Sequence, residues 1–113
     1  MDNIKVINSG NKYAHVSVGE ISTFSGKQFI KDATGASSCE ISFGTLGEGE
    51  SVPFFHSHKA NEENYIILTG TGRFQVGNDV FDVGEGSVVK VSTGCGRNLK
   101  CTSRTPMTYI CIQ

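Results

Sequence analysis

Short runs of apolar and β-branched residues, separated by glycine, make up most of the chain. Residues 39–46 read Cys-Glu-Ile-Ser-Phe-Gly-Thr-Leu, in which apolar and polar positions alternate over most of the run. A period of two is typical of a half-buried β-strand. Similar runs predict strands at 13–18, 52–58, 64–68, 73–76, 80–83, 87–91 and 107–112. A short helical turn is expected only at 28–33.

Turns fall between these runs at short intervals. The chain contains 14 glycines, and Gly77-Asn78-Asp79 separates two predicted strands with residues that favour a tight hairpin. Many short strands joined by turns indicate an all-β antiparallel sandwich or barrel. Such folds close on themselves and so leave few exposed sheet edges.

The length and net charge limit the number of domains and the kinds of partner that the chain can have. With 113 residues, the chain is expected to form a single domain over 1–113. Ten basic and 11 acidic residues give a net charge of −1, so binding to nucleic acid or to an anionic membrane is not expected. No apolar run approaches a membrane span. The N-terminus lacks the features of a signal peptide, which favours a cytoplasmic protein.

Candidate chemistry begins with two histidines on one predicted strand. His56 and His58 are two residues apart, so their side chains project from the same face, about 7 Å apart along the strand. Glu63 follows after a short turn-forming stretch and begins the next strand. Two imidazoles and a carboxylate form the ligand set of non-haem iron sites, and equally of catalytic zinc sites.

These residues resemble the first motif of the cupin superfamily, G-x5-H-x-H-x3or4-E-x6-G. His56, His58, Glu63 and Gly70 match its spacing, while Gly49 lies one residue further upstream than the pattern asks. The resemblance extends over residues 39–112. It implies an antiparallel double-stranded β-helix, or jelly-roll barrel, and a divalent transition metal (Fe, Mn, Ni or Zn) held by His56, His58 and Glu63.

The second cupin motif, G-x5-P-x-G-x2-H-x3-N, is only partly present. Gly86 and Gly94 keep its spacing, but Arg97 stands where the family has its fourth ligand, a histidine, and Cys101 stands in place of asparagine. Arginine stays protonated and has no acceptor atom, so it cannot ligate a metal. Arg97 either points to solvent or faces the interior, where its guanidinium is suited to a carboxylate or phosphate of a ligand.

Strand parity selects further interior residues. Phe54 and Tyr65 lie on the same faces of their strands as the predicted ligands, so we expect them to line a ligand cavity. Phe74 and Val76 are expected to face inward as well. The isolated His15 is interpreted as a structural or surface residue.

The four cysteines are widely spaced and form no zinc-ribbon or redox motif. Cys39 and Cys111 lie among strand-forming residues and are expected to be buried, reduced thiols. Cys95 and Cys101 lie near Arg97 in the sequence. Either thiol could replace the missing ligand, although no spacing argument selects one, and both are better interpreted as bystanders.

Three hypotheses follow from the sequence. The first is a metal-dependent enzyme, such as a dioxygenase or isomerase, acting on a small oxygenated metabolite. The second is a non-catalytic barrel that binds a sugar or sugar acid, with Arg97, Tyr65 and Phe54 contacting the ligand. The third is a metal-free or assembly role, and the family resemblance implies a homodimer. The sequence does not decide whether the protein is an enzyme.

Overall fold

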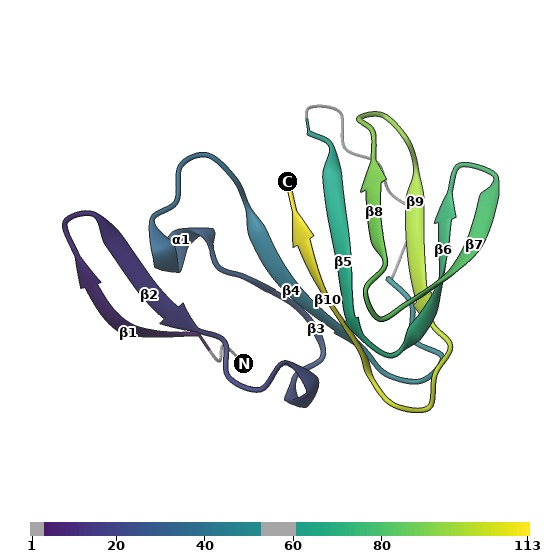
Figure 1. Ribbon diagram of the computed structural model, residues 1–113, viewed down its shortest axis with the longest axis horizontal. Coiled ribbons are helices and arrows are strands. Elements are labelled where there is room, and N and C mark those ends of the chain that lie inside the picture. The colour runs from purple at the N-terminus through teal and green to yellow at the C-terminus, as the bar shows by residue number, and fades with distance from the viewer. Residues whose placement is uncertain (1–3, 53–60) are drawn as a thin grey trace.

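The computed structural model describes residues 4–52 and 61–113. Figure 1 shows an antiparallel β-barrel with a hairpin on one side of it. The elements in chain order are β1 (Lys5–Gly10), β2 (Tyr13–Ser17), η1 (Ile21–Thr23), β3 (Gly26–Phe29), α1 (Lys31–Thr34), β4 (Ile41–Leu46), β5 (Glu63–Thr69), β6 (Thr71–Val76), β7 (Asp79–Gly84), β8 (Val88–Val91), β9 (Arg97–Cys101) and β10 (Met107–Ile112).

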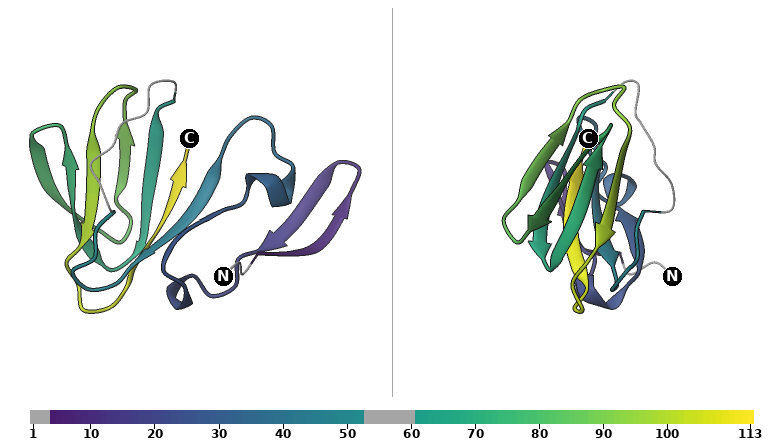
Figure 2. Two further views of the ribbon diagram at one scale, coloured as in Figure 1. Left: turned by 180° about the vertical axis from the view of Figure 1, so that it is seen from behind. Right: turned by 90° about the vertical axis from the view of Figure 1, so that its right-hand side faces the viewer.

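Two antiparallel sheets form the barrel. One has the strand order β3-β4-β10-β5-β8, and the other has the order β7-β6-β9. The second sheet lies alongside the first as a separate layer (Figure 2). Buried side chains from both sheets form one core, with Tyr65 and Ile67 from the larger sheet and Phe74 and Leu99 from the smaller. The predicted all-β antiparallel barrel is therefore confirmed.

Strand β5 shows how the sequence pattern positions side chains. Glu63, Tyr65 and Ile67 are buried, while the alternating residues Ile66 and Leu68 are partly exposed. Because successive side chains of a strand point to opposite faces, the first three face the interior and the other two face outward. A carboxylate thus stands on the same face as the core residues.

The predicted strands 64–68, 73–76, 80–83 and 107–112 all lie within observed strands. The turn predicted around Gly77 joins β6 to β7, with Gly77 in the left-handed region at φ 57°. The predicted strand 52–58 falls almost entirely outside the described residues. Strands β1, β3 and β9 were not predicted, because their polar residues and glycines obscure the alternation.

The helical turn predicted at 28–33 was wrong in its position. Gln28 and Phe29 pair with β4 as part of strand β3, and the helical turn α1 starts only at Lys31. Pairing with a neighbouring strand overrides weak local propensity. Helix α1 ends at Gly35, whose φ of 72° lets its amide donate to the carbonyl of Lys31 at 2.8 Å.

The N-terminal strands β1 and β2 form a two-stranded sheet of their own. This hairpin stands beside the barrel, next to α1, and is not part of either barrel sheet (Figure 1). Every residue of β1 is exposed. Among the described residues, no helix has both the length and the apolar character needed to span a membrane.

Candidate functional site

Glu63 is a carboxylate in the barrel interior. It is the first residue of β5, where its backbone is opposite Val91 of β8. Its side chain is 1 % exposed. The period of two places it on the same face as Tyr65. Burying a carboxylate is costly unless it is paired and hydrogen-bonded, so its partners define the site.

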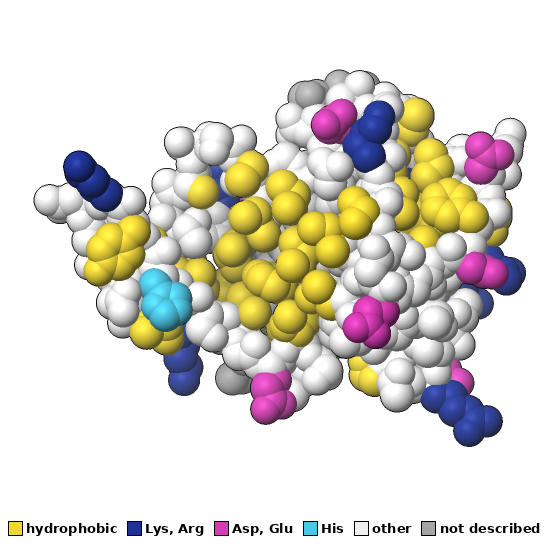
Figure 3. All heavy atoms as spheres, in the orientation of Figure 1, with side chains coloured by type: hydrophobic (Ala, Val, Ile, Leu, Met, Phe, Trp, Pro, Cys, Tyr) yellow, Lys and Arg dark blue, Asp and Glu magenta, His cyan; other side chains and the backbone are white. Residues whose placement is uncertain are grey.

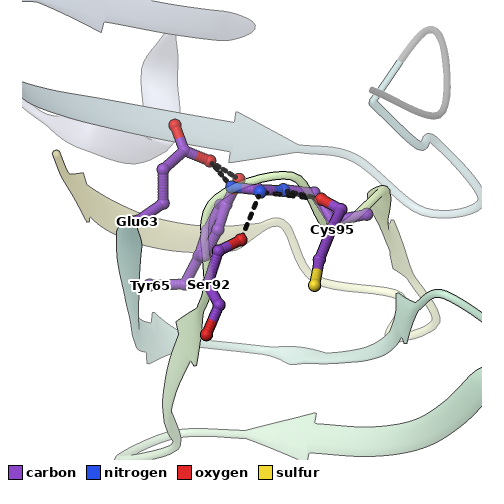
Figure 4. Close-up of polar contacts among 5 residues, drawn as sticks. Glu63, Tyr65, Ser92 and Cys95 are labelled. Carbon is purple, nitrogen blue, oxygen red and sulfur yellow. Dashed lines mark hydrogen bonds and ion pairs between the residues drawn. The ribbon is translucent and has the colours of Figure 1, made fainter. Parts of the chain in front are cut away.

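The charged partner of Glu63 among the described residues is Arg97, on the opposite sheet. Arg97 is the first residue of β9, and its side chain is also 1 % exposed. Its Nη1 lies 2.8 Å from Oε1 of Glu63 (Figure 4). The ion pair therefore links the two sheets inside the barrel. Of the two interpretations of Arg97 from the sequence, the interior one agrees with this geometry, and the anion it meets is a side chain of the same protein.

Further hydrogen bonds fix both charged groups. The Tyr65 hydroxyl donates to the same Oε1 of Glu63 at 2.5 Å. Nε and Nη2 of Arg97 donate to the carbonyl of Cys95 at 3.2 and 2.8 Å, and Nη2 also reaches the carbonyl of Ser92 at 3.3 Å. All three guanidinium nitrogens are thus engaged. The guanidinium is therefore held between the carboxylate of Glu63 and the carbonyls of Ser92 and Cys95 in the loop before β9, three residues that Figure 4 labels.

The neighbouring titratable groups stay neutral. Burial, with the hydrogen bond to Glu63, raises the pKa of Tyr65 far above its usual range. Burial also raises the pKa of Tyr109. For Cys111, burial raises the pKa to about 12, although the positive charge of Lys27 opposes the shift. The interior around the pair therefore holds protonated phenols and a thiol beside two charges that cancel.

An aromatic group lies beside the ion pair. The rings of Tyr65 and Phe74 meet edge to face, with centroids 5.0 Å apart, and the centroids of Tyr65 and Tyr109 are 6.1 Å apart. Phe74 is fully buried, and Val76 is partly buried against the core. Both therefore lie where strand parity predicted. A few polar groups against an apolar wall are the usual composition of a small-molecule site.

The predicted metal ligands can be examined only in part. His56 and His58, and the predicted ligand-contacting Phe54, lie outside the described residues. Residues 4–52 and 61–113 contain no cluster of three His, Cys, Asp or Glu side chains suited to a metal ion. Glu63, the predicted ligand among them, already has a guanidinium 2.8 Å from one oxygen. A divalent cation there would meet a fixed positive charge, so the described donor set does not fit a metal.

The cysteines take no direct part in this arrangement. Cys95 contributes its backbone carbonyl, while its side chain is partly buried against the core. Cys101 is buried four residues beyond Arg97, and its thiol lies 3.5 Å from the carbonyl of Ser103. The strand rise puts it roughly 13 Å along β9 from Arg97. Cys111 is buried as expected, but Cys39 is only partly buried, and all four thiols are free.

The pairing of Glu63 with Arg97 was missed at the level of sequence. Both are predicted site residues, but the sequence assigned Glu63 to a metal and left Arg97 open between solvent and a ligand anion. The sequence does contain a signal for the pairing. Arg97, at the position of the family's fourth ligand, is a cation, and Glu63 of the first motif is a carboxylate. The carbonyls of Ser92 and Cys95 carry no sequence signal, because every residue has a carbonyl. His15, by contrast, is exposed on β2, in line with its surface interpretation.

Comparisons with known proteins agree with this architecture. The family model described as "Cupin domain" matches residues 42–113. The crystal structure of a cupin protein from Bacteroides fragilis is 29% identical, with a TM-score of 0.83 over 92% of this chain and 85% of that one.

More distant solved structures share the fold. A cupin superfamily protein from Desulfitobacterium hafniense is 17% identical, with a TM-score of 0.64 over 77% of this chain and 73% of that one. A conserved protein with a double-stranded β-helix domain from Klebsiella pneumoniae is 13% identical, with a TM-score of 0.64 over 68% of this chain and 67% of that one. No curated protein matches the chain. The family match covers more than half of the residues, and the chain therefore belongs to the cupin domain family.

Proposed function

We propose that this cupin is a small-molecule-binding barrel that works without a metal and takes a neutral, polyhydroxylated ligand of the sugar class. The observation that carries the proposal is the buried contact of 2.8 Å between Glu63 and Arg97. It puts a permanent cation at the position where the family resemblance expects the fourth metal ligand.

The charge of the pair favours a neutral ligand. Arg97 balances Glu63, so the two side chains together contribute no net charge. An anionic ligand would have to displace Glu63 from the guanidinium or leave an excess negative charge in the interior. A metal cation beside Glu63 would be repelled by the guanidinium of Arg97. A neutral molecule avoids both costs.

Hydroxyl groups match the hydrogen-bonding groups of the site. Each hydroxyl can donate to a carboxylate or phenol oxygen and accept from a guanidinium. Glu63, Arg97 and Tyr65 supply all three groups within one hydrogen-bonded cluster. The aromatic rings of Tyr65, Phe74 and Tyr109 supply apolar surface beside them. Alternating polar and apolar edges are what a sugar ring presents.

A metal-dependent enzyme is the second candidate. It is supported by the spacing of His56, His58 and Glu63 and by the burial of Glu63 in the interior. In this candidate Arg97 would have to release the carboxylate before a metal could use it. The substrate would be a small oxygenated metabolite, as predicted from the resemblance.

Thermal-shift screening with neutral sugars and with sugar acids at matched concentration tests the proposal. We expect a neutral sugar to raise the melting temperature and the corresponding acid to have no effect. The Tyr65→Phe variant should lose the shift, because it removes a donor from the cluster. Arg73→Gln, a change at an exposed arginine, serves as the matched surface control. Stabilisation by acids alone would refute the neutral-ligand assignment.

A further inference from the structure

Glu40, just before β4, has a buried carboxylate oxygen without a hydrogen bond. Its Oε2 is covered, and it accepts no hydrogen bond from the described part of the chain. The residue as a whole is only partly buried. A buried acceptor without a partner has lost its hydration and gained no bond in exchange. Such groups are rare in native proteins, so this oxygen calls for an explanation.

The strand register places Glu40 on the interior face of the larger sheet. Glu40 and Gln113 exchange two backbone hydrogen bonds, of 2.8 and 2.9 Å, one step beyond the last pair of β4 and β10. The next residues of the same parity, Ser42 and Cys111, are opposite each other and both buried. Because side chains alternate between the two faces of a sheet, Glu40 and Gln113 also project to the interior.

Gln113 connects Glu40 to the buried ion pair. Ile112 is opposite Asn64 of β5, so one further step in the same register brings Gln113 opposite Glu63. Glu40, Gln113 and Glu63 therefore form one row at the ends of the neighbouring strands β4, β10 and β5. Glu40 and Gln113 are partly exposed, whereas Glu63 is buried. The row thus leads from solvent to the site.

We infer that Glu40 is a further ligand-binding residue, and that the ligand is a single sugar ring held between Glu40 and Glu63 across the amide of Gln113. This inference rests on the proposed function, because the ring is the neutral ligand proposed above. One hydroxyl donates to Oε2 of Glu40. A hydroxyl on the opposite side of the ring hydrogen-bonds with Glu63 and Arg97. The Gln113 amide offers both donors and an acceptor between them.

The separation of the two carboxylates suits one ring. Two strand spacings put the backbones of Glu40 and Glu63 about 10 Å apart, and their side chains leave the sheet in the same direction. A sugar ring with one hydrogen bond at each end spans a distance of this order. A shared cation would need both carboxylates within about 2.5 Å of one point, which parallel side chains at this spacing do not provide.

A charge of opposite sign balances Glu40. Lys27 of β3 is opposite Gly44, which is opposite Tyr109, so Lys27 projects to the interior face. Its Nζ lies 5.8 Å from the centre of the Tyr65 ring. With Lys27 and Glu40 added to the ion pair, these two cations and two carboxylates still cancel. The preference for a neutral ligand is therefore unchanged.

Exposed carboxylates do not have the same reason to bind a sugar. Figure 3 shows one face of the molecule, on which acidic side chains stand singly rather than in a patch. Glu48, exposed in the turn after β4, is an ordinary surface carboxylate. It keeps its hydration, so it gains less from a sugar hydroxyl than a buried oxygen without a partner gains. Glu48 is therefore the matched control for Glu40.

Thermal melting of the ligand-free protein tests the buried oxygen without any sugar. Glu40→Met replaces the carboxylate with an apolar side chain of similar size. It should raise the melting temperature by about 3 °C, because the variant no longer buries an acceptor without a partner. Glu48→Met should leave the melting temperature unchanged. An unchanged or lower value in Glu40→Met would overturn the inference, since the carboxylate would then serve the fold.

Isothermal titration calorimetry with D-glucose, D-galactose, D-mannose and glycerol tests the binding. A hexose that binds wild type should bind Glu40→Met about 10-fold more weakly, as expected for the loss of one hydrogen bond to a charged group. Glu48→Met should bind it as wild type does. Glycerol is too short to span the row, so Glu40→Met should change its affinity little.

Two results of the titration would count against the account, and they differ in what they refute. Equal hexose affinity in wild type and Glu40→Met would overturn the role of Glu40 and leave the proposed function intact. Failure of all three hexoses to bind wild type would refute the proposed function and, with it, the sugar ring assigned to this row.

Discussion

Nη1 of Arg97 lies 2.8 Å from Oε1 of Glu63, and the two residues come from the first positions of strands in different sheets. The contact therefore does two things. It ties the sheets together at one end of the barrel, and it cancels the charge of the carboxylate that the family resemblance assigns to a metal. Both consequences can be measured.

Removing either partner of this pair should be strongly destabilising. Glu63→Gln leaves a buried guanidinium without its anion, and Arg97→Met leaves the carboxylate without its cation. Each change should lower the free energy of unfolding by about 3 kcal/mol or more. The double variant should be closer to wild type than the sum of the single changes, because neither charge is then left alone. Urea denaturation of all four proteins measures the coupling.

The exposed pair Arg73–Asp82 is the natural control for this cycle. Its atoms are 3.4 Å apart, and the side chains are 59 % and 82 % exposed. Exposed pairs typically contribute less than about 1 kcal/mol. The same cycle with Arg73→Met and Asp82→Asn should therefore give almost no coupling. Equal coupling in the two cycles would contradict the account of the buried pair.

Alkaline pH should weaken the fold through Cys111. Its pKa is raised by burial to about 12 from an ordinary value of 9.0. Above pH 9 the unfolded chain loses the thiol proton, while the folded chain keeps it until about pH 12. The unfolded state then binds fewer protons, so stability falls as pH rises through this window and is constant in this respect below it.

Urea unfolding between pH 8 and pH 11 checks this expectation. The loss of stability with pH should be steeper in wild type than in Cys111→Ala. Some dependence should remain in the variant, since the pKa values of Tyr65 and Tyr109 are also raised by burial. Identical slopes in the two proteins would show that the Cys111 thiol does not contribute.

Gly44 should tolerate no side chain. It lies on β4 opposite Tyr109, and an added Cβ would overlap the Tyr109 ring. Gly44→Ala should therefore cost about 2 kcal/mol in the free energy of unfolding, as overpacking in a core does. Gly84→Ala is the matched control, because the nearest side-chain atom there, on Thr71, is at 3.8 Å. A larger loss at Gly84 than at Gly44 would contradict this packing.

Much of the barrel could be predicted from the sequence. Strands such as β5 and β10 have strong alternation or β-branched residues, and both segments form strands in the structure, with many of their side chains buried. Strand β3 reads Gly-Lys-Gln-Phe and was not predicted, since its place depends on pairing with β4 rather than on its own residues. The hairpin strand β1 is entirely exposed, so it has no buried face that a pattern could reveal.

The sequence could predict which residues lie in the site, but not which of them contact one another. Strand parity placed Tyr65 and Phe74 in the interior, and the motif selected Glu63 and Arg97. Their pairing depends on how the two sheets face each other, which is a long-range feature that local patterns do not encode. The metal set of His56, His58 and Glu63 stays a prediction, because both histidines lie outside the described residues.

Metal content, measured by elemental mass spectrometry on tag-free protein, tests the central claim most directly. We predict that wild type binds no stoichiometric iron, manganese, nickel or zinc after incubation with each ion, because Arg97 holds Glu63. Arg97→His restores the fourth-ligand histidine and removes the cation, and it should gain a bound metal. Stoichiometric metal in wild type that is lost in His56→Ala would contradict the account and favour the metal-dependent enzyme.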